Sequence, residues 1–432
     1  MIKENPSLYD FAKKIFYYPR SISGNGVRDT LKEIKQLVPE LKVHEIKTGT
    51  KVFDWVIPNE WNVTDAFIIC PDGKKICNFN ENNLHLLNYS VPINAEISLE
   101  ELDNHLYYLK DKPDAVPYVT SYYEDRWGFC LSYNERKKLK KGNYKVLIDS
   151  SKQSGSLSLG EVILKGKSTD EVFISTYTCH PSMGNNETSG ITVATFLAKW
   201  IKEYFPERKY TYRIVFAPET IGALTYLNIK KNLSLLKENV KFAFNINCVG
   251  DNNSYSYLPS RDGNLEIDRV SRHVFRNLNL KFKEFNFFRD RGSDECQYSS
   301  PEVNLPMVSL MRTKYAEYDE YHTSLDNLDF ISQEGLEGGL EIHKKCIEIL
   351  EKNCYFKTDF IGEPFFSKYN LRSTLSANEK DMDNILKFST IVNCADGMHS
   401  LLEVADLLGV PIWSLYEPFE RLLQKKIIRI IK

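Results

Sequence analysis

The sequence predicts an α/β protein whose mostly parallel sheet is covered by helices on both faces, with a small inserted α+β domain and a helical C-terminal unit. Three observations predict this fold. Strand-like and helix-like segments alternate from about residue 155, short β-rich runs fill residues 50–150, and about seventy residues follow a turn-rich linker. The 432 residues suffice for two or three domains. With 42% hydrophobic residues, a sizeable core can form.

The α/β part is predicted from its alternating periodicity. Strands are expected at Glu171–Tyr177, Tyr212–Ala217, Phe242–Val249 and Pro306–Leu310. Helices are expected at 191–201, 221–229 and Gln333–Leu350, and two more within the first forty residues. Such alternation favours a parallel sheet, which holds its ligands beyond the carboxyl ends of the strands.

The inserted domain is expected at residues 46–149, so that residues 1–45 and 150–358 together form the α/β domain. Its β-rich runs, such as Ala66–Cys70, are separated by turns such as Pro71-Asp72-Gly73. One helix is expected at Ser98–Leu109, where Ser98 and Glu101 have the spacing of a capping box. An aromatic group, Tyr122-Tyr123 with Trp127 to Cys130, is interpreted as core of this domain rather than as a substrate platform.

The C-terminal domain is expected at residues 359–432, after the linker Gly362-Glu363-Pro364. Helices at 383–388, 400–408 and 411–424 and a strand at 427–431 have a helix–turn–helix pattern, with Gly409 at the turn. The helix from Pro411 to Gln424 is expected to kink at Pro418. Its early acidic residues, Glu417 and Glu420, favour protein contact over reading of the DNA groove.

Composition and sequence patterns disfavour several classes of partner. A formal net charge of −2 gives no general attraction to nucleic acid or to anionic membranes. No stretch resembles a signal peptide or a transmembrane helix. The nine scattered cysteines favour neither a disulfide framework nor a thiolate zinc site. We therefore expect a cytoplasmic protein with no membrane partner and with nucleic acid disfavoured.

Polar residues follow the predicted strands in three loops. His180 follows the first strand and is placed to present a ring nitrogen to a metal, and Asn186 stands where a helix cap would. Glu219 follows the second strand and suits a general base. His322, in a later loop, suits a second imidazole ligand, with Asp326 as its partner. The alternatives are a hydrogen-bonded structural His, a carboxylate facing a helix dipole, and a solvated loop His.

Three further carboxylates complete the candidates. Asp251, Asp294 and Glu295 lie in predicted loops. Each is interpreted as a metal ligand, an acceptor for a substrate ammonium group or a plain loop residue.

These loops, in this order, resemble the motifs of the co-catalytic zinc aminopeptidases. His180 matches the first His of that family, Asn186 stands at its bridging Asp, and Glu219 stands at its general base. Tyr321 to Asp326 match its Tyr-His-Thr-x-x-Asp element. The chain resembles most a branch with an inserted domain and a C-terminal winged helix, often associated with polysaccharide biosynthesis. The runs that carry this likeness are Val52–Trp55, Ser121–Cys130, Cys179–Gly190, Pro218–Gly222, Gly292–Glu295 and Tyr321–Asn327.

The departures from that family concern the metal ligands. Asn186, Thr220 and Asn247 are neutral where the family has carboxylates. An amide oxygen is a poor ligand for a divalent cation. The resemblance therefore implies at most one tightly bound zinc ion, with no metal as the alternative. His180 and His322 would hold it, Asn186 would contribute weakly, and the remaining candidates are Glu187, Asp294 and Glu295.

Three functions remain open at this point. The first is a metal-dependent hydrolase that cleaves an amide near a free amine or an N-acyl group, with Glu219 moving the protons. The second is a degenerate pocket that binds its ligand without cleaving it. The third is a docking or nucleic-acid module built on the winged helix. The expected ligand is a small peptide or an amine-bearing small molecule, with Asp326, Tyr321 and Asp251 as supporting or substrate-contacting residues, and the winged helix is expected to contact a protein.

Overall fold

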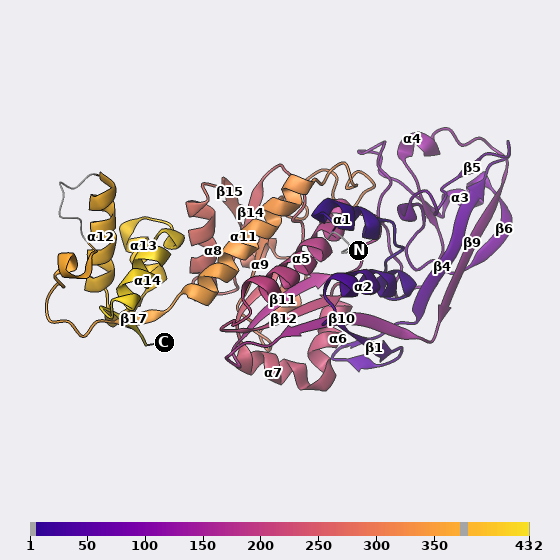
Figure 1. The fold of residues 1–432 in the computed structure, drawn as a ribbon. Helices are drawn as coiled ribbons and strands as arrows, with labels where there is room; N and C mark the ends of the chain where they lie inside the picture. The colour runs from indigo at the N-terminus through magenta and orange to yellow at the C-terminus, as the bar shows by residue number, and fades with distance from the viewer. Residues whose placement is uncertain (1–5, 372–378, 432) are drawn as a thin grey trace, which may run out of the picture. The chain divides into compact units, whose positions relative to one another are not determined.

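The fold was obtained as a computed structural model, which describes residues 6–371 and 379–431 (Figure 1). Two compact units can be distinguished. One comprises Met1–Ile267 with Phe282–Glu341, and the other comprises Asp268–Lys281 with Ile342–Lys432. Within the described ranges, no helix is long and apolar enough to cross a membrane.

The first unit contains an eight-stranded sheet, and its mostly parallel character is confirmed. In spatial order its strands are β1 (Lys42–Lys47), β10 (Ser156–Leu164), β12 (Thr211–Ala217), β11 (Glu171–Tyr177), β13 (Val240–Asn245), β16 (Met307–Met311), β14 (Tyr255–Leu258) and β15 (Phe282–Glu284). The central strands β12, β11, β13 and β16 are all parallel. Their carboxyl ends therefore point to one edge of the sheet, where the polar loops follow.

Helices cover both faces of this sheet, as predicted (Figure 1). Those that precede or follow its strands are α1 (Leu8–Phe16), α2 (Asn25–Leu37), α5 (Ser189–Tyr204), α6 (Ile221–Asn228), α7 (Asn232–Asn239), α9 (Phe287–Asp290) and α10 (Glu295–Tyr298). Two longer helices, α8 (Glu266–Asn277) and α11 (Gln333–Lys352), each begin in the first unit. Alternate residues of β11 face opposite ways, so that Phe173 stacks on Tyr226 of α6 with ring centroids 6.1 Å apart.

The inserted segment is built on a four-stranded antiparallel sheet. In spatial order this sheet is β5 (Lys75–Ile76), β4 (Glu60–Ile69), β9 (Asn143–Gln153) and β6 (Ile93–Ser98). The smaller elements are β2 (Lys51–Val52), β3 (Trp55–Val56), α3 (Leu99–Asp103), β7 (Leu106–Tyr107), β8 (Phe129–Cys130) and α4 (Tyr133–Arg136).

The helix predicted at Ser98–Leu109 is too long. Ser98 does cap it, accepting a hydrogen bond from the backbone of Glu101 at 3.2 Å. The helix nevertheless ends at Asp103, because Leu106 and Tyr107 pair in parallel with β8. Tertiary pairing thus overrides local helix propensity here.

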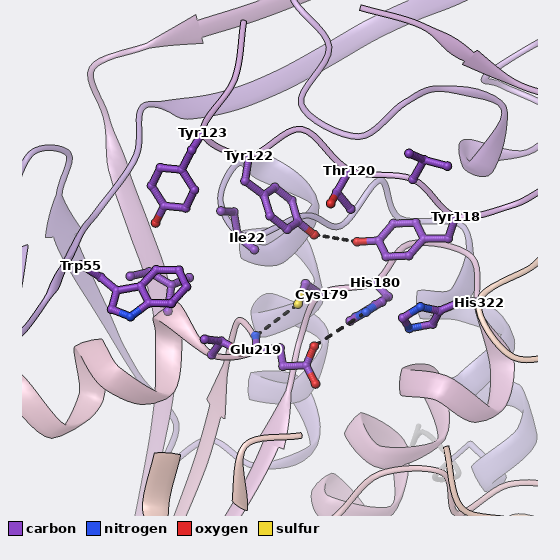
Figure 2. A pocket seen from close by; sticks show the side chains of 13 residues that line it. Ile22, Trp55, Tyr118, Thr120, Tyr122, Tyr123, Cys179, His180, Glu219 and His322 are labelled. Atoms are coloured by element: carbon purple, nitrogen blue, oxygen red, sulfur yellow. Dashed lines mark hydrogen bonds and ion pairs between the residues drawn. The ribbon is translucent and has the colours of Figure 1, made fainter. Parts of the chain in front are cut away.

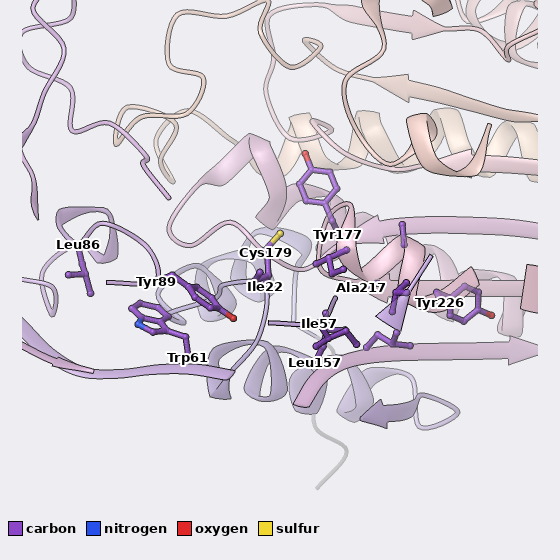
Figure 3. Close-up of a cluster of buried hydrophobic side chains, with 14 of the residues drawn as sticks. Ile22, Ile57, Trp61, Leu86, Tyr89, Leu157, Tyr177, Cys179, Ala217 and Tyr226 are labelled. Atoms are coloured by element: carbon purple, nitrogen blue, oxygen red, sulfur yellow. The ribbon is translucent and has the colours of Figure 1, made fainter. Parts of the chain in front are cut away.

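A single hydrophobic core joins the inserted segment to the large sheet. Figure 3 shows Trp61 and Tyr89 of the insertion in the same cluster as Tyr177 and Ala217, which end β11 and β12. Trp61 and Tyr89 are stacked, with ring centroids 5.5 Å apart. Because buried side chains interdigitate closely, this core fixes the insertion against the edge of the sheet that carries the polar loops.

The second unit contains the predicted winged helix. Its three-stranded sheet has the order β18 (Asp396–Ser400), β17 (Tyr355–Lys357) and β19 (Arg429–Ile430), and its helices include α12 (Glu379–Asn393), α13 (Leu401–Leu408) and α14 (Tyr416–Gln424). The continuous helix predicted from Pro411 is wrong. Ile412–Ser414 form a separate 3₁₀ turn, and Pro418 lies in the first turn of α14, where its missing N–H needs no partner and causes no kink.

Candidate functional site

The three polar loops predicted from the sequence meet at one pocket, a cavity of about 510 Å³. His180 comes from the loop after β11, Glu219 from the loop after β12, and His322 from the loop that follows β16. Figure 2 shows these three side chains together on one side of the cavity. Parallel strands bring such loops together because their carboxyl ends share an edge.

His180 is the most constrained of the three residues. Its φ is +21°, an unusual value for a residue with a Cβ, and its side chain is buried. Nε2 lies 3.8 Å from Oε2 of Glu219, beyond hydrogen-bond distance, and Nδ1 has no hydrogen-bond partner among the described residues. Burial, reinforced by the neighbouring His322, holds the pKa of His180 well below its usual value. The imidazole is therefore neutral at physiological pH.

The carboxyl group of Glu219 has a pKa near neutral pH. Burial raises its pKa to about 7, a hydrogen bond with the Ser293 side chain opposes that shift, and the charge of Glu295 adds to it. Its side chain is still 25% exposed, so it reaches the cavity. Its backbone N–H donates to Sγ of Cys179 at 3.1 Å, which fixes the start of the loop. A carboxyl with this pKa can act as a proton acceptor or as an ammonium acceptor.

His322 lines the cavity beside His180, and the two ring centroids are 5.0 Å apart. It has a φ of +56° and stacks on Tyr321 with centroids 3.9 Å apart. Burial lowers its pKa to about 4. Both imidazoles are thus neutral, so each can accept a hydrogen bond.

Asp294 is fully buried next to the loop that carries Glu219. Its Oδ1 accepts a hydrogen bond from the backbone N–H of Thr220 at 2.7 Å, while Oδ2 has no partner among the residues described. Burial, and then the charge of Glu219, hold its pKa well above the usual range. Two carboxyl groups this close and this buried do not both ionise readily.

Glu295 and Asp251, two other predicted site residues, are buried and accept hydrogen bonds from the residues around them. Glu295 accepts hydrogen bonds from the backbone N–H groups of Gly292 and Ser293 and from the side chains of Tyr315 and Asn245, at 2.7 to 2.9 Å. Asp251 accepts from the backbone and hydroxyl of Thr313 and from Asn185, at 2.7 to 3.0 Å. Neither residue lines the cavity.

Asp326 fastens the first loop rather than bonding to His322. Its two oxygens accept hydrogen bonds from the backbone N–H groups of Asn185 and Asn186, at 2.6 and 2.9 Å, and from the hydroxyl of Tyr318 at 3.0 Å. Burial raises its pKa to about 6, and these donors oppose the shift. The sequence had suggested His322 as its partner.

Asn186 and Glu187 are buried and do not line the cavity. The side-chain amide of Asn186 donates to the Tyr177 hydroxyl at 2.8 Å. Its Oδ1 has no partner within the described part of the chain. Glu187 accepts from the hydroxyl of Thr176 at 3.0 Å, and burial holds its pKa well above the usual range.

The donor set does not fit the zinc centre that the resemblance implies. A catalytic zinc site normally uses three protein ligands drawn from His, Cys, Asp and Glu. In the described ranges, no group of three or more such residues is arranged to hold a metal ion. Asn186, Thr220 and Asn247 stand where carboxylates would complete the set, and both side-chain polar atoms of Asn247 are buried without a hydrogen-bond partner among the described residues.

An aromatic wall of the cavity was missed from the sequence. Trp55, Tyr118, Tyr122 and Tyr123, all from the insertion, line it (Figure 2). Assigning the aromatic group of the insertion to the core is correct for Phe129, which is fully buried. Tyr122 packs against the same core and also lines the cavity, whereas Tyr123 is exposed and lines the cavity. The alternation of hydrophobic and polar residues along a strand could not predict their position, because these tyrosines lie outside any strand.

The aromatic wall is fastened to the loop of His322. The backbone N–H of Tyr118 donates to the carbonyl of His322 at 2.9 Å, and Pro117 forms an antiparallel bridge with Thr323. The ring of Tyr118 lies 4.8 Å from that of His180, centroid to centroid. The insertion is therefore part of the site and not an appendage to it.

Comparison with known proteins places this chain in a family. Residues 9–353 match the model of a domain of unknown function, DUF4910, and residues 353–430 match a winged helix-turn-helix. The chain belongs to this DUF4910 family. This match and the relatives described next confirm the prediction of an aminopeptidase-like branch with a C-terminal winged helix.

A protein of Clostridium acetobutylicum is 38% identical over 426 residues, covering 98% of this chain and 96% of its own. Its provisional name is polysaccharide biosynthesis protein with aminopeptidase-like domain. A crystal structure from the same organism, provisionally titled a peptidase, has a TM-score of 0.91 at 36% identity and covers 98% of this chain and 96% of that one.

More distant structures share the fold alone. A zinc aminopeptidase from Bacillus subtilis superposes with a TM-score of 0.55 at 14% identity, covering 79% of this chain and 93% of its own. A peptidase M28 precursor from Shewanella amazonensis gives 0.55 at 14% identity, covering 84% of this chain and 96% of its own. The aminopeptidase-like fold predicted from the sequence is confirmed.

Proposed function

We propose that the aminopeptidase-like pocket of this protein binds an amine-bearing small molecule, with Glu219 as the acceptor for its ammonium group. The observation that carries the proposal is the charge of the lining. Among the described residues that line the cavity, Glu219 is the one carboxylate, and none is Lys or Arg. An ionised Glu219 therefore makes the pocket selective for a cation.

The neighbouring residues support this selectivity. His180 and His322 are neutral, since burial lowers the pKa of both, so they do not repel a cation. Aromatic faces attract ammonium groups through their quadrupoles, and Tyr118 lies beside both imidazoles. A charge-assisted hydrogen bond to Glu219 is stronger than a neutral one. Since Glu219 has a pKa of about 7, a bound ammonium would also favour its ionised form.

Binding is supported over metal-dependent cleavage by the donor set. The residues described provide no three-ligand group for a metal, which an aminopeptidase uses to polarise the scissile carbonyl. The provisional name of the Clostridium relative supports a place for this ligand in polysaccharide biosynthesis.

Calorimetric titration with matched ligand pairs tests the proposal. Leucinamide and glucosamine carry a free amine, whereas their N-acetyl derivatives do not. We expect at least one amine to bind, its acetylated partner to bind at least tenfold more weakly, and Glu219→Gln to remove the difference. Glu207→Gln is the control, because Glu207 is 82% exposed. Equal affinity for the free and acetylated forms would overturn the proposal.

A second candidate function is hydrolysis of an amide next to a free amine, or of an N-acyl group. The observation that favours it is the position of Glu219, whose pKa of about 7 suits a general base that takes a proton from water. Release of p-nitroaniline from leucine p-nitroanilide, lost in Glu219→Gln, would support this function. An unchanged rate in that variant would remove Glu219 from the reaction.

We further propose that the winged helix contacts a protein and that the chain acts in the cytoplasm. Support for protein contact is the acidic start of α14, where Glu417 is 75% exposed on its side chain. DNA-reading helices use this region for base contacts. Salt-sensitive binding of the full chain to duplex DNA in an electrophoretic shift assay would overturn this assignment.

A further inference from the structure

Two aromatic side chains stand partly exposed where the cavity meets the insertion. Trp55 is 40% exposed and Tyr123 is 54% exposed, yet both line the pocket. Their ring centroids are 6.0 Å apart and the rings are inclined by 59°, so they form an open corner rather than a stacked pair. Large aromatic rings usually bury most of their area, and exposed apolar groups that border a cavity commonly mark a binding surface.

This corner is held in place without a ligand. The hydroxyl of Tyr123 donates to the carbonyl of Val56 at 3.1 Å, which ties it to the hairpin of β2 and β3 that carries Trp55. Val52 of the same hairpin is fully buried in the core that joins the insertion to the sheet. A preformed surface of this kind loses little side-chain entropy when a ligand binds.

The corner formed by Trp55 and Tyr123 lies across the cavity from His180 and His322 (Figure 2). Figure 2 shows Trp55 and Tyr123 on one side, His180 and His322 on the other, and Glu219 below. The wall between them carries hydroxyl groups: those of Tyr118 and Tyr122 are 2.7 Å apart, and Thr120 also lines the cavity. A ligand that fills this space needs a cationic end, a polar edge and an apolar face.

We propose that Trp55 and Tyr123 form a subsite for the pyranose ring of an amino sugar whose ammonium group meets Glu219. This inference rests on the proposed amine-binding function and names its ligand class. A pyranose presents apolar C–H groups on its faces and hydroxyls around its edge. It can therefore pack flat against one ring of the corner while its hydroxyls bond to the tyrosine hydroxyls and to water. An aliphatic side chain, by contrast, gains most from an enclosed apolar pocket, which this open corner does not provide.

Titrations of four proteins with two amines test the subsite. The proteins are the wild type, Trp55→Ala, Tyr123→Ala and Phe288→Ala; the last is a control, because Phe288 is 63% exposed and does not line the cavity. Affinities for glucosamine and leucinamide are measured by calorimetry at pH 7. For glucosamine we expect a loss of about threefold to tenfold in each of the first two variants, the range typical of aromatic contacts. For leucinamide we expect changes below about twofold in both Trp55→Ala and Tyr123→Ala. For Phe288→Ala we expect changes below about twofold with either amine.

Tryptophan fluorescence provides a second readout. Among the five tryptophans, Trp55 borders the cavity, so glucosamine should alter the emission of the wild type but not that of Trp55→Phe. The same variant still presents an aromatic face, so it should retain most of the glucosamine affinity, which separates a lost contact from a damaged fold.

The outcomes distinguish this inference from the proposed function. Leucinamide binding that depends on Glu219, together with no glucosamine binding, would overturn the sugar subsite and leave the amine proposal standing. An equal loss for both amines in Trp55→Ala would also overturn it. If neither amine binds the wild type, both proposals fail.

Discussion

Arg20 donates a hydrogen bond from Nη2 to the carbonyl oxygen of His180 at 3.2 Å, although 160 residues separate them. The same nitrogen donates to the hydroxyl of Thr188 at 2.9 Å, and Nη1 donates to the carbonyl of Ile15. Arg20 is fully buried, and burial lowers its pKa to about 10. One guanidinium thus ties the end of α1 to both ends of the loop that carries His180.

We predict that Arg20→Lys lowers the free energy of unfolding by about 2–4 kcal/mol, because an ammonium cannot serve three separated acceptors and leaves buried carbonyls unpaired. Amine affinity should fall as well, since His180 loses its support. Urea unfolding and calorimetry measure the two effects. Thr195→Val is the control, because its hydroxyl bonds only within α5, to the carbonyl of Ile191 at 2.7 Å, and its loss should cost about 1 kcal/mol. Full amine affinity in Arg20→Lys would contradict the role given to Arg20.

The pKa of Glu219 gives a prediction about pH. With a pKa of about 7, roughly a tenth of Glu219 is ionised at pH 6 and roughly nine tenths at pH 8. Affinity for an amine that stays protonated throughout, such as benzylamine, should therefore rise about tenfold across this range. Glu219→Gln should flatten the profile, and a flat profile in the wild type would contradict the assignment.

The same pKa predicts a change in stability of opposite sign. Burial raises the pKa of Glu219 above its ordinary value of 4.5, so folding favours the protonated form. The stability that Glu219 contributes is therefore present below about pH 4.5 and is lost as the pH rises through about 7. The melting temperature of Glu219→Gln, relative to that of the wild type, should rise over this interval.

The sequence predicted the parts of the site that depend on strand order. β11 begins and ends where expected, and β12 begins one residue early, because buried β-branched and aromatic runs bounded by turns can be recognised locally. His180, Glu219 and His322 could be placed together because parallel strands share an edge. Trp55 and Tyr123 could not, since their place in the pocket depends on how the insertion packs against the sheet. The short α3 and the broken helix at Ser414 show the same limit, as tertiary contacts end elements that local propensity would extend.

The neutral residues at three positions where the zinc aminopeptidases have carboxylates predict how zinc binding can be changed. We expect the wild type to retain at most one equivalent of zinc through gel filtration, because Asn186, Thr220 and Asn247 supply no charge. The variant with Asn186→Asp, Thr220→Glu and Asn247→Asp together should retain more zinc. It should also melt at a lower temperature than the wild type when chelator is present, since it buries new carboxylates without a partner. Elemental analysis that finds two equivalents in the wild type would contradict this prediction.

The winged-helix unit should depend on a helix far from it in sequence. His273 of α8 is buried; its Nδ1 lies 2.8 Å from Oδ1 of Asp406, and its Nε2 accepts a hydrogen bond from the backbone N–H of Ile412 at 3.0 Å. Arg269 of the same helix pairs with Glu403 and Asp406 of α13. All of these residues belong to the second unit, which combines Asp268–Lys281 with the C-terminal segment.

His273→Ala leaves the buried N–H of Ile412 without an acceptor and removes the contact of the imidazole with Asp406, which keeps only its bond from Arg269 among the interactions described. It should therefore destabilise the second unit by about 2–3 kcal/mol. A matched control exists in the same unit, where His399 pairs with Asp396 at 2.9 Å across three residues and its side chain is 41% exposed. His399→Ala should cost less than about 0.5 kcal/mol, as local, solvated ion pairs do. Hydrogen exchange at α13 separates the two variants, because only the loss of His273 should speed exchange there.

A segment of residues 353–432 produced alone lacks His273 and should melt at a lower temperature than the second unit within the full chain. Equal protection of α13 in the segment and in the full chain would show instead that the winged helix folds independently of α8.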